Sequence, residues 1–137
     1  MKIIKTWLPA AVWMGIIFYF SGRQKVQVSE QFILNFIFFK TLHLAEYFVL
    51  YTLIYRTVLN YSKESGRKTP VVAILYTLFY AVTDEIHQGF VPTREGKLRD
   101  VIIDGIGGMM AWIYIAKLLP KAPQKLKHLA MSSGIIT

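Results

Sequence analysis

Long apolar runs separated by short polar segments make up most of the chain. The first run, residues 6–20, contains no charged side chain and follows Lys2 and Lys5. Extended back to Ile3, it is long enough to cross a bilayer as a helix. A basic start before an apolar run is also typical of a signal peptide, but no cleavage site of small residues follows Phe20. We therefore predict that a first transmembrane helix forms here.

Three further apolar runs, residues 41–59, 71–91 and 101–119, each carry ionisable side chains toward one end. Pro70 precedes the 71–91 run, and proline is favoured in the first turn of a helix. Taken together, the four runs predict an all-α fold, an integral membrane bundle of four transmembrane helices.

A shorter apolar run, residues 32–39, lies between the first two predicted spans. It is too short to cross a bilayer by itself. We therefore predict a short interfacial or partly re-entrant helix here, packed against the bundle and capped by Ser29.

The chain becomes more basic after Pro120. Pro120 and Pro123 should stop the last transmembrane helix, since proline cannot continue a helix interior. We expect the rest to be a mobile segment that contacts anionic membrane lipids through its lysines. The chain then divides into a membrane domain, residues 1–119, and a basic tail, residues 120–137.

Composition excludes several other classes of protein. Of the 137 residues, 54% are hydrophobic and 18% charged, against about 25% charged in an average soluble domain. So small a core cannot bury this much apolar side chain in water. An aromatic content of 15% excludes disorder, and the absence of cysteine excludes disulfides and thiolate metal sites. The net charge of +8 comes from residues that flank the spans, so nucleic-acid binding is not required to explain it.

Lys and Arg are more frequent near the amino terminus, in the polar 60–69 loop and in the tail than on the other side of the predicted bundle. Since basic residues accumulate on the cytoplasmic side, we predict that both termini are cytoplasmic.

In this topology, ionisable side chains of three predicted spans meet near the outer face. His43 and Glu46 share one helix face, and Asp100 and Asp104 share another, because residues at i and i+3 or i+4 are neighbours. Glu85 points about 100° away from Asp84, toward a loop. The candidate catalytic residues are His43, Glu46, Asp84, Glu85, His87 and Asp104. The candidate substrate-binding residues are Lys40, Gln88, Arg94, Arg99 and Asp100.

Small residues continue the face of Asp100 and Asp104 along the fourth predicted span. Gly107, Gly108 and Ala111 would let a neighbouring helix approach closely. The glycine-rich stretch 105–108 follows no strand and lacks the spacing of a nucleotide-binding loop. We therefore expect the carboxylates to point into the bundle.

Ionisable groups at membrane depth are costly and usually face the bundle interior or an aqueous cavity. Histidines beside carboxylates suit acid–base chemistry, and a rim of Lys40, Arg94 and Arg99 suits a phosphate or carboxylate group. The alternative is a purely structural network in which basic groups neutralise Glu46, Asp84 and Asp104. Imidazole and carboxylate could also ligate a divalent metal, but there is no ligand motif such as H-E-x-x-H, so the cofactor stays unknown and a metal is not favoured.

Several segments resemble the VanZ-like family of bacterial membrane proteins. They are Phe-Ser-Gly at 20–22, Lys-Thr-Leu-His-Leu-Ala-Glu-Tyr at 40–47, Asp-Glu-Ile-His-Gln-Gly-Phe-Val-Pro-Thr-Arg at 84–94, and Asp-Val-Ile-Ile-Asp at 100–104 followed by Gly107. Their order and their placement at the ends of predicted helices both fit, over about residues 1–119.

The resemblance implies a small multi-span protein of the bacterial plasma membrane. The family takes its name from a member linked to resistance to the glycopeptide teicoplanin in Gram-positive bacteria. Asn is common in the family at the position of Asp104, so the resemblance does not demand a charge there.

Three functions remain compatible with these residues. One is an enzyme, a hydrolase or transferase acting on a lipid-linked or phosphorylated envelope component. In it His43 or His87 would carry the proton, and Arg94 would help to hold the anion. The second is a non-catalytic binding or transport protein. The third is a partner subunit whose polar network is structural. No Ser or Cys stands in a recognisable nucleophilic setting, so covalent catalysis has no support.

Overall fold

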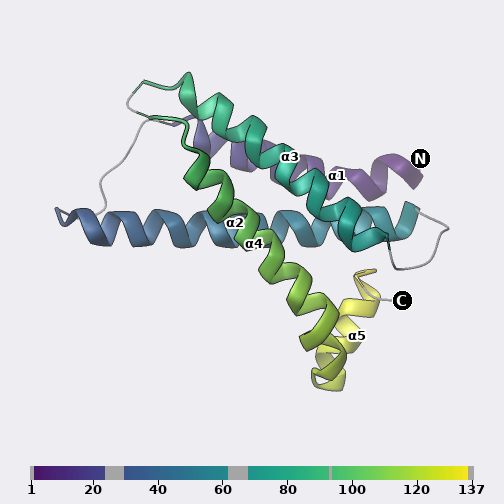
Figure 1. Ribbon diagram of the computed structural model, residues 1–137. Coiled ribbons are helices and arrows are strands. Elements are labelled where there is room, and N and C mark those ends of the chain that lie inside the picture. Colours follow the sequence, from purple (N-terminus) through teal and green to yellow (C-terminus); the bar gives the residue numbers. More distant parts are fainter. Residues whose placement is uncertain (1, 24–29, 62–67, 93, 136–137) are drawn as a thin grey trace.

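The computed structural model describes residues 2–23, 30–61, 68–92 and 94–135, and these residues form helices and loops without a strand (Figure 1). The α-helices are α1 (Lys2–Ser21), α2 (Phe32–Tyr61), α3 (Thr69–Gly89), α4 (Leu98–Ile113) and α5 (Gln124–Ser132). After α4 the chain continues through a π-helical turn, Tyr114–Leu118, and a 3₁₀ turn, Leu119–Lys121.

The four long helices form a bundle in which α2 is the central member. Helix α4 crosses α2 and packs on both α2 and α3, while α1 lies mainly against α2 (Figure 1). Both chain termini lie toward the same end of the bundle, as an even number of spans requires (Figure 1). We call this end the terminal end, and the other, where α3 ends and α4 begins, the polar end.

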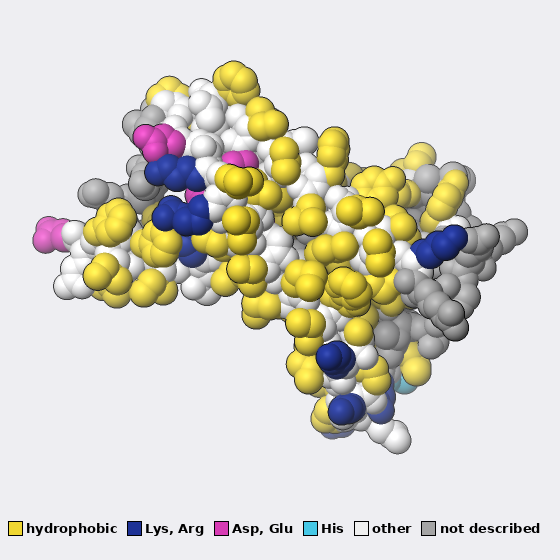
Figure 2. All heavy atoms as spheres, in the orientation of Figure 1, with side chains coloured by type: hydrophobic (Ala, Val, Ile, Leu, Met, Phe, Trp, Pro, Cys, Tyr) yellow, Lys and Arg dark blue, Asp and Glu magenta, His cyan; other side chains and the backbone are white. Residues whose placement is uncertain are grey.

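The length and composition of four helices confirm that each could cross a membrane, as the sequence predicted. Ile4–Ser21, Phe32–Tyr61, Thr69–Gly89 and Leu98–Lys121 are each long and apolar enough to cross a membrane. Their outer surfaces are apolar too: Phe79 is 69% exposed and Ile102 is 57% exposed (Figure 2). An apolar side chain this open to the outside is expected where lipid, rather than water, surrounds the protein.

One face of α2 provides the centre of the core. Tyr47, Leu50, Tyr51 and Ile54 repeat at intervals of three and four residues and are almost completely buried. This is the spacing of a single helix face. The face packs against buried side chains of the other helices, including Ile17, Ala73, Ile74, Ala81 and Ala111.

Small residues bring α4 close to α2, as the sequence predicted. A Cβ atom added at Gly107 would lie 2.6 Å from the backbone oxygen of Leu44, and one added at Gly105 would lie 2.9 Å from Cδ2 of Leu78. No side chain fits at that distance from the Leu44 backbone, so Gly107 fixes the distance of α4 from α2. Gly105 instead lets α4 pack closely on the Leu78 side chain of α3.

The separate interfacial helix predicted between the first two spans is absent from the described residues. Residues 32–39 instead form the first turns of α2, which is 30 residues long and runs without interruption to Tyr61. Residues 32–61 contain no proline or glycine, and extending an existing helix is easier than nucleating a new one. The proposed cap, Ser29, lies outside the described residues.

The tail contains a short helix, α5, which the sequence analysis did not predict. Pro123 directly precedes α5, where proline is tolerated because the first turn needs no amide donor. At the other end Gly134 has a φ of 72°, its N–H donates to the Met131 carbonyl, and the Ile135 N–H donates to the Ala130 carbonyl. This is a Schellman cap. Ile135 packs against the bundle core, so the cap returns the chain to the four-helix bundle.

Candidate functional site

Polar side chains from α1, α2, α3 and α4 meet at the polar end. Figure 2 shows the acidic side chains visible on this face gathered toward this end, beside basic ones. The sequence predicted this clustering from the positions of ionisable residues within three spans. The hydrogen bonds and ion pairs divide the cluster into two networks, which we call the Asp84 network and the Asp104 network.

The Asp84 network joins α1 to α3 and to the loop that follows α3. Asp84 is 1% exposed, and both of its carboxylate oxygens accept hydrogen bonds: Oδ1 from the Ser21 hydroxyl and Oδ2 from Nε2 of Gln88 at 3.0 Å. Nη1 of Arg94 donates in turn to Oε1 of Gln88 at 3.1 Å. A fully buried carboxylate is thus stabilised by two neutral donors, and Arg94 is connected to it through an amide.

The Asp104 network joins α2 to α4. Nδ1 of His43 lies 3.1 Å from Oδ1 of Asp104, which is completely buried. Because a carboxylate only accepts hydrogen bonds, Nδ1 carries the hydrogen of this pair and Nε2 remains as the second ring nitrogen. One turn toward the polar end, Nζ of Lys40 lies 2.7 Å from Oδ1 of Asp100. The side chain of Arg99 is 59% exposed and approaches the same oxygen at 3.4 Å.

Glu46 lies on α2, one turn after His43. Charged groups of both networks, His43 and Asp104 of one and Asp84 and Arg94 of the other, are near enough to act on its carboxyl. Its backbone oxygen accepts a hydrogen bond from Nε1 of Trp13 at 2.9 Å, which ties this turn of α2 to α1. The predicted convergence of α2, α3 and α4 side chains therefore holds for Glu46 and for the members of both networks.

Glu85 connects the end of α3 to the start of α4. Its Oε1 accepts a hydrogen bond from the backbone N–H of Lys97, the residue that precedes α4, at 2.6 Å. A carboxylate at a helix amino terminus is stabilised by the helix dipole. The backbone also packs closely here, because a Cβ atom at Gly96 would lie 2.8 Å from the Glu85 backbone oxygen. Glu85 does point toward a loop, as its helical position predicted.

His87 faces α1. Its ring stacks on Phe18 with a centroid separation of 3.8 Å and an interplanar angle of 17°. Gly22 also lies close to this ring, since an added Cβ there would lie 3.1 Å from it. His87 therefore stands at the α1 side of the cluster and takes part in neither network's hydrogen bonds among the described residues.

Five buried polar atoms of the cluster have no hydrogen-bond partner among the described residues: Tyr47 Oη, Glu85 Oε2, His87 Nδ1, Arg94 Nε and Asp104 Oδ2. Most buried polar groups in proteins are paired, and an unpaired one costs about 1–3 kcal/mol. Both donors and acceptors are represented, so the cluster offers a polar ligand partners of both kinds.

Two residues of the cluster, Ser21 and Tyr47, were not predicted as site residues from the sequence. Ser21 donates to Asp84, and Tyr47 is 0% exposed with an unpaired hydroxyl. Ser21 belongs to the Phe-Ser-Gly segment that ends the first apolar run, and Tyr47 lies four residues after His43 on the same helix face. Its helical spacing from His43 was therefore an available signal.

No group of three or more His, Asp or Glu side chains able to hold a metal ion occurs within the described ranges. The carboxylates are instead distributed over separate contacts, with Ser21 and Gln88 on Asp84, Lys40 on Asp100 and His43 on Asp104.

The fold and the cluster define a class of protein, a multi-pass helical bundle with a polar network at one end of its apolar spans. A family model described as VanZ/LLP1 matches residues 6–119, and the chain belongs to this family. The match ends at residue 119, near the end of the last apolar span, Leu98–Lys121. It confirms the resemblance found in the sequence segments. Among curated proteins and among solved structures no match was found.

Proposed function

We propose that the polar end binds the anionic, phosphate-bearing headgroup of a lipid-linked cell-envelope component. In this proposal the protein spans the bacterial plasma membrane, both termini are cytoplasmic, and the polar end faces outward. The observation that carries the proposal is the set of five buried polar atoms of the cluster that lack a partner among the described residues, one of which is Nε of Arg94. A headgroup with phosphate oxygens and hydroxyl groups could satisfy donors and acceptors together.

Arg94 is the best placed anion-binding group of the cluster. It is held by one hydrogen bond to Gln88, and its buried Nε has no partner in the part of the chain that the structure describes. Guanidinium groups bind phosphate oxygens through two parallel hydrogen bonds. Lys40 and Arg99 both lie near Asp100, which neutralises part of their charge. They would contribute to the rim of the site, with Arg94 as its centre.

An enzyme acting on the same component is the second candidate, and the contact between His43 and Asp104 favours it. Because Asp104 accepts from Nδ1, it fixes the ring so that Nε2 can take a proton from a hydroxyl group. Such a group could be an attacking water in a hydrolase or a second substrate in a transferase. If headgroup binding altered the envelope component on which glycopeptides act, resistance to teicoplanin would be one outcome.

Lipid analysis of the purified protein tests the proposal. Wild-type protein extracted in an uncharged detergent should retain an anionic lipid that mass spectrometry identifies, and the Arg94→Gln variant should retain about tenfold less, since a charged hydrogen bond is lost. Arg23→Gln is the matched control, because Arg23 lies at the same end, where its guanidinium lies over the Tyr19 ring. Equal lipid content in all three proteins would contradict the proposal and favour a structural network.

A further inference from the structure

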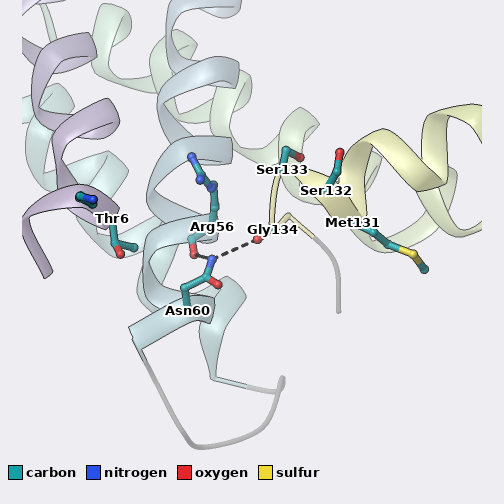
Figure 3. Close-up of a pocket in the computed structure, with 8 residues that line it drawn as sticks. Thr6, Arg56, Asn60, Met131, Ser132, Ser133 and Gly134 are labelled. Atoms are coloured by element: carbon teal, nitrogen blue, oxygen red, sulfur yellow. Dashed lines mark hydrogen bonds between the residues drawn. The ribbon is translucent and has the colours of Figure 1, made fainter. Parts of the chain in front are cut away.

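A second polar site lies at the terminal end of the bundle, opposite the Asp84 and Asp104 networks. It is a cavity of about 420 Å³ between the start of α1, the end of α2 and the end of α5 (Figure 3). This volume lies within the range of about 300–1,000 Å³ that is usual for small-molecule sites. Three elements far apart in the sequence therefore enclose a space large enough for a phosphate group.

The charges that line this cavity are positive. Lys5 of α1 and Arg56 of α2 contribute cationic side chains, and no Asp or Glu is among the described residues that line it. Figure 3 shows Arg56 and Asn60 extending from α2 between α1 and the last turn of α5. Two cations without a lining carboxylate attract an anion.

Arg56 carries a donor that the described residues leave unused. Its Nε is buried and has no hydrogen-bond partner. Buried N–H groups are nearly always paired, so an acceptor at this position would stabilise the arrangement. Guanidinium combined with ammonium is a common way to bind a phosphate group.

The cap reduces the repulsion that the last turn of α5 would exert on an anion. Helix carboxyl termini usually repel anions because their carbonyl oxygens are unpaired. Here the carbonyls of Leu129, Ala130 and Met131 accept hydrogen bonds from the residues of the cap, and the Gly134 carbonyl accepts one from Nδ2 of Asn60 at 3.2 Å. These four carbonyl groups are therefore already paired beside the cations of the cavity.

Gly134 brings the backbone close to the guanidinium. A Cβ atom at this position would lie 3.6 Å from Nε of Arg56 and 3.2 Å from Nδ2 of Asn60, and the φ of 72° is one that side-chain-bearing residues rarely adopt. The Schellman cap of α5 thus forms one wall of the cavity.

We propose that this cavity is a phosphate-binding site formed by Lys5, Arg56 and the cap of α5. Its ligand is a phosphate group, supplied either by the headgroup of an anionic lipid such as phosphatidylglycerol or by free phosphate. The site is separate from the headgroup site at the polar end and does not depend on it.

The test uses the full chain in an uncharged detergent, with binding measured by native mass spectrometry and by shifts in thermal unfolding. The probes are phosphatidylglycerol, phosphatidylcholine and inorganic phosphate. Arg56→Gln and Lys5→Gln should each weaken binding by at least about tenfold, because each removes one charged contact. Lys125→Gln is the matched control, since Lys125 lies on α5 but does not line the cavity.

The three probes distinguish the two sources of the phosphate group. Binding of phosphatidylglycerol, but not of inorganic phosphate, supports the site with a lipid ligand, and binding of inorganic phosphate supports it with a free ligand. Lys5 is exposed, so Lys5→Gln should fold even if Arg56→Gln does not. Absence of binding by both anionic probes, or binding that Lys5→Gln leaves unchanged, overturns the proposal. Lys5→Gln should weaken binding by the same factor in the Arg94→Gln variant as in the wild type, which separates this site from that at the polar end.

Discussion

Gly107 of α4 lies directly against the backbone of Leu44 on α2, so that a Cβ atom at Gly107 would stand 2.6 Å from the Leu44 oxygen. This contact sets the distance between the two helices one turn away from the pair formed by His43 and Asp104. Helix packing and the polar network therefore depend on the same crossing.

Gly107→Ala should destabilise the protein by about 1–3 kcal/mol, because the added methyl group must push α4 away from α2. The measurement is thermal unfolding in detergent. Gly15→Ala is the control, since an added Cβ there meets nothing within 4 Å. It should be neutral or stabilising by up to about 1 kcal/mol, the usual gain of alanine over glycine in a helix. Equal effects of both substitutions would show that the α2–α4 crossing is not tightly packed.

His43→Ala should cost about 3–5 kcal/mol, because it leaves the buried carboxylate of Asp104 without its partner. Asp104→Asn should cost less, since an amide oxygen can still accept the hydrogen bond from Nδ1. In the double variant the loss of His43 no longer strands a charge, so the two effects should not add. Additive effects in unfolding experiments would mean that the two side chains do not interact.

The ion pair between Lys40 and Asp100 should contribute about 1–2 kcal/mol to stability, as measured by a double-mutant cycle. Both side chains are mostly buried, with exposures of 17% and 14%. The contact between Lys97 and Glu95 provides the contrast: it is as short, at 2.7 Å, but its side chains are 50% and 78% exposed. We expect no measurable coupling there, because water and salt screen exposed pairs.

His87→Phe separates the stacking of this ring from its hydrogen-bonding capacity. Phenylalanine can keep the stack on Phe18, so the melting temperature should stay close to that of the wild type. The unpaired Nδ1 is lost, so retention of an anionic lipid at the polar end should fall. His87→Ala, which loses both properties, should lower stability as well. Unchanged lipid content in His87→Phe would assign His87 a packing role alone.

The sequence was sufficient to predict the four spans and the clustering of polar residues at one end. Apolar run length determines whether a helix can cross a bilayer, and helical spacing determines which side chains share a face. His43 with Asp104, and Lys40 with Asp100, are paired across α2 and α4 because each helix presents its two residues on one face. Their partners, however, depend on the rotation of one helix against the other.

For His87, the sequence did not show how α3 is rotated against α1. Helical spacing places His87 on one face with Asp84, and both side chains do contact α1, Asp84 through Ser21 and His87 through Phe18. What the spacing did not show is that the His87 ring stacks on Phe18 instead of hydrogen-bonding within the Asp84 network. The continuous start of α2 was missed for another reason. Residues 32–39 are too few to span a bilayer alone, and hydrophobicity does not show that the helix continues through Lys40. Helix α5 was missed because Pro120 and Pro123 were interpreted only as the end of the last transmembrane helix, although Pro123 also precedes a new helix.

The length of α2 has a mechanical consequence. At about 1.5 Å per residue its 30 residues extend about 45 Å, well beyond a hydrocarbon layer of about 30 Å. Phe32 and Ile33 at its free end are 76% and 68% exposed, so the excess length is apolar. Such a helix must tilt, or the surrounding lipid must thicken, at a cost of a fraction of a kcal/mol per ångström. A change in bilayer thickness should therefore alter the tilt of α2, the helix that carries His43 and Lys40 against α4.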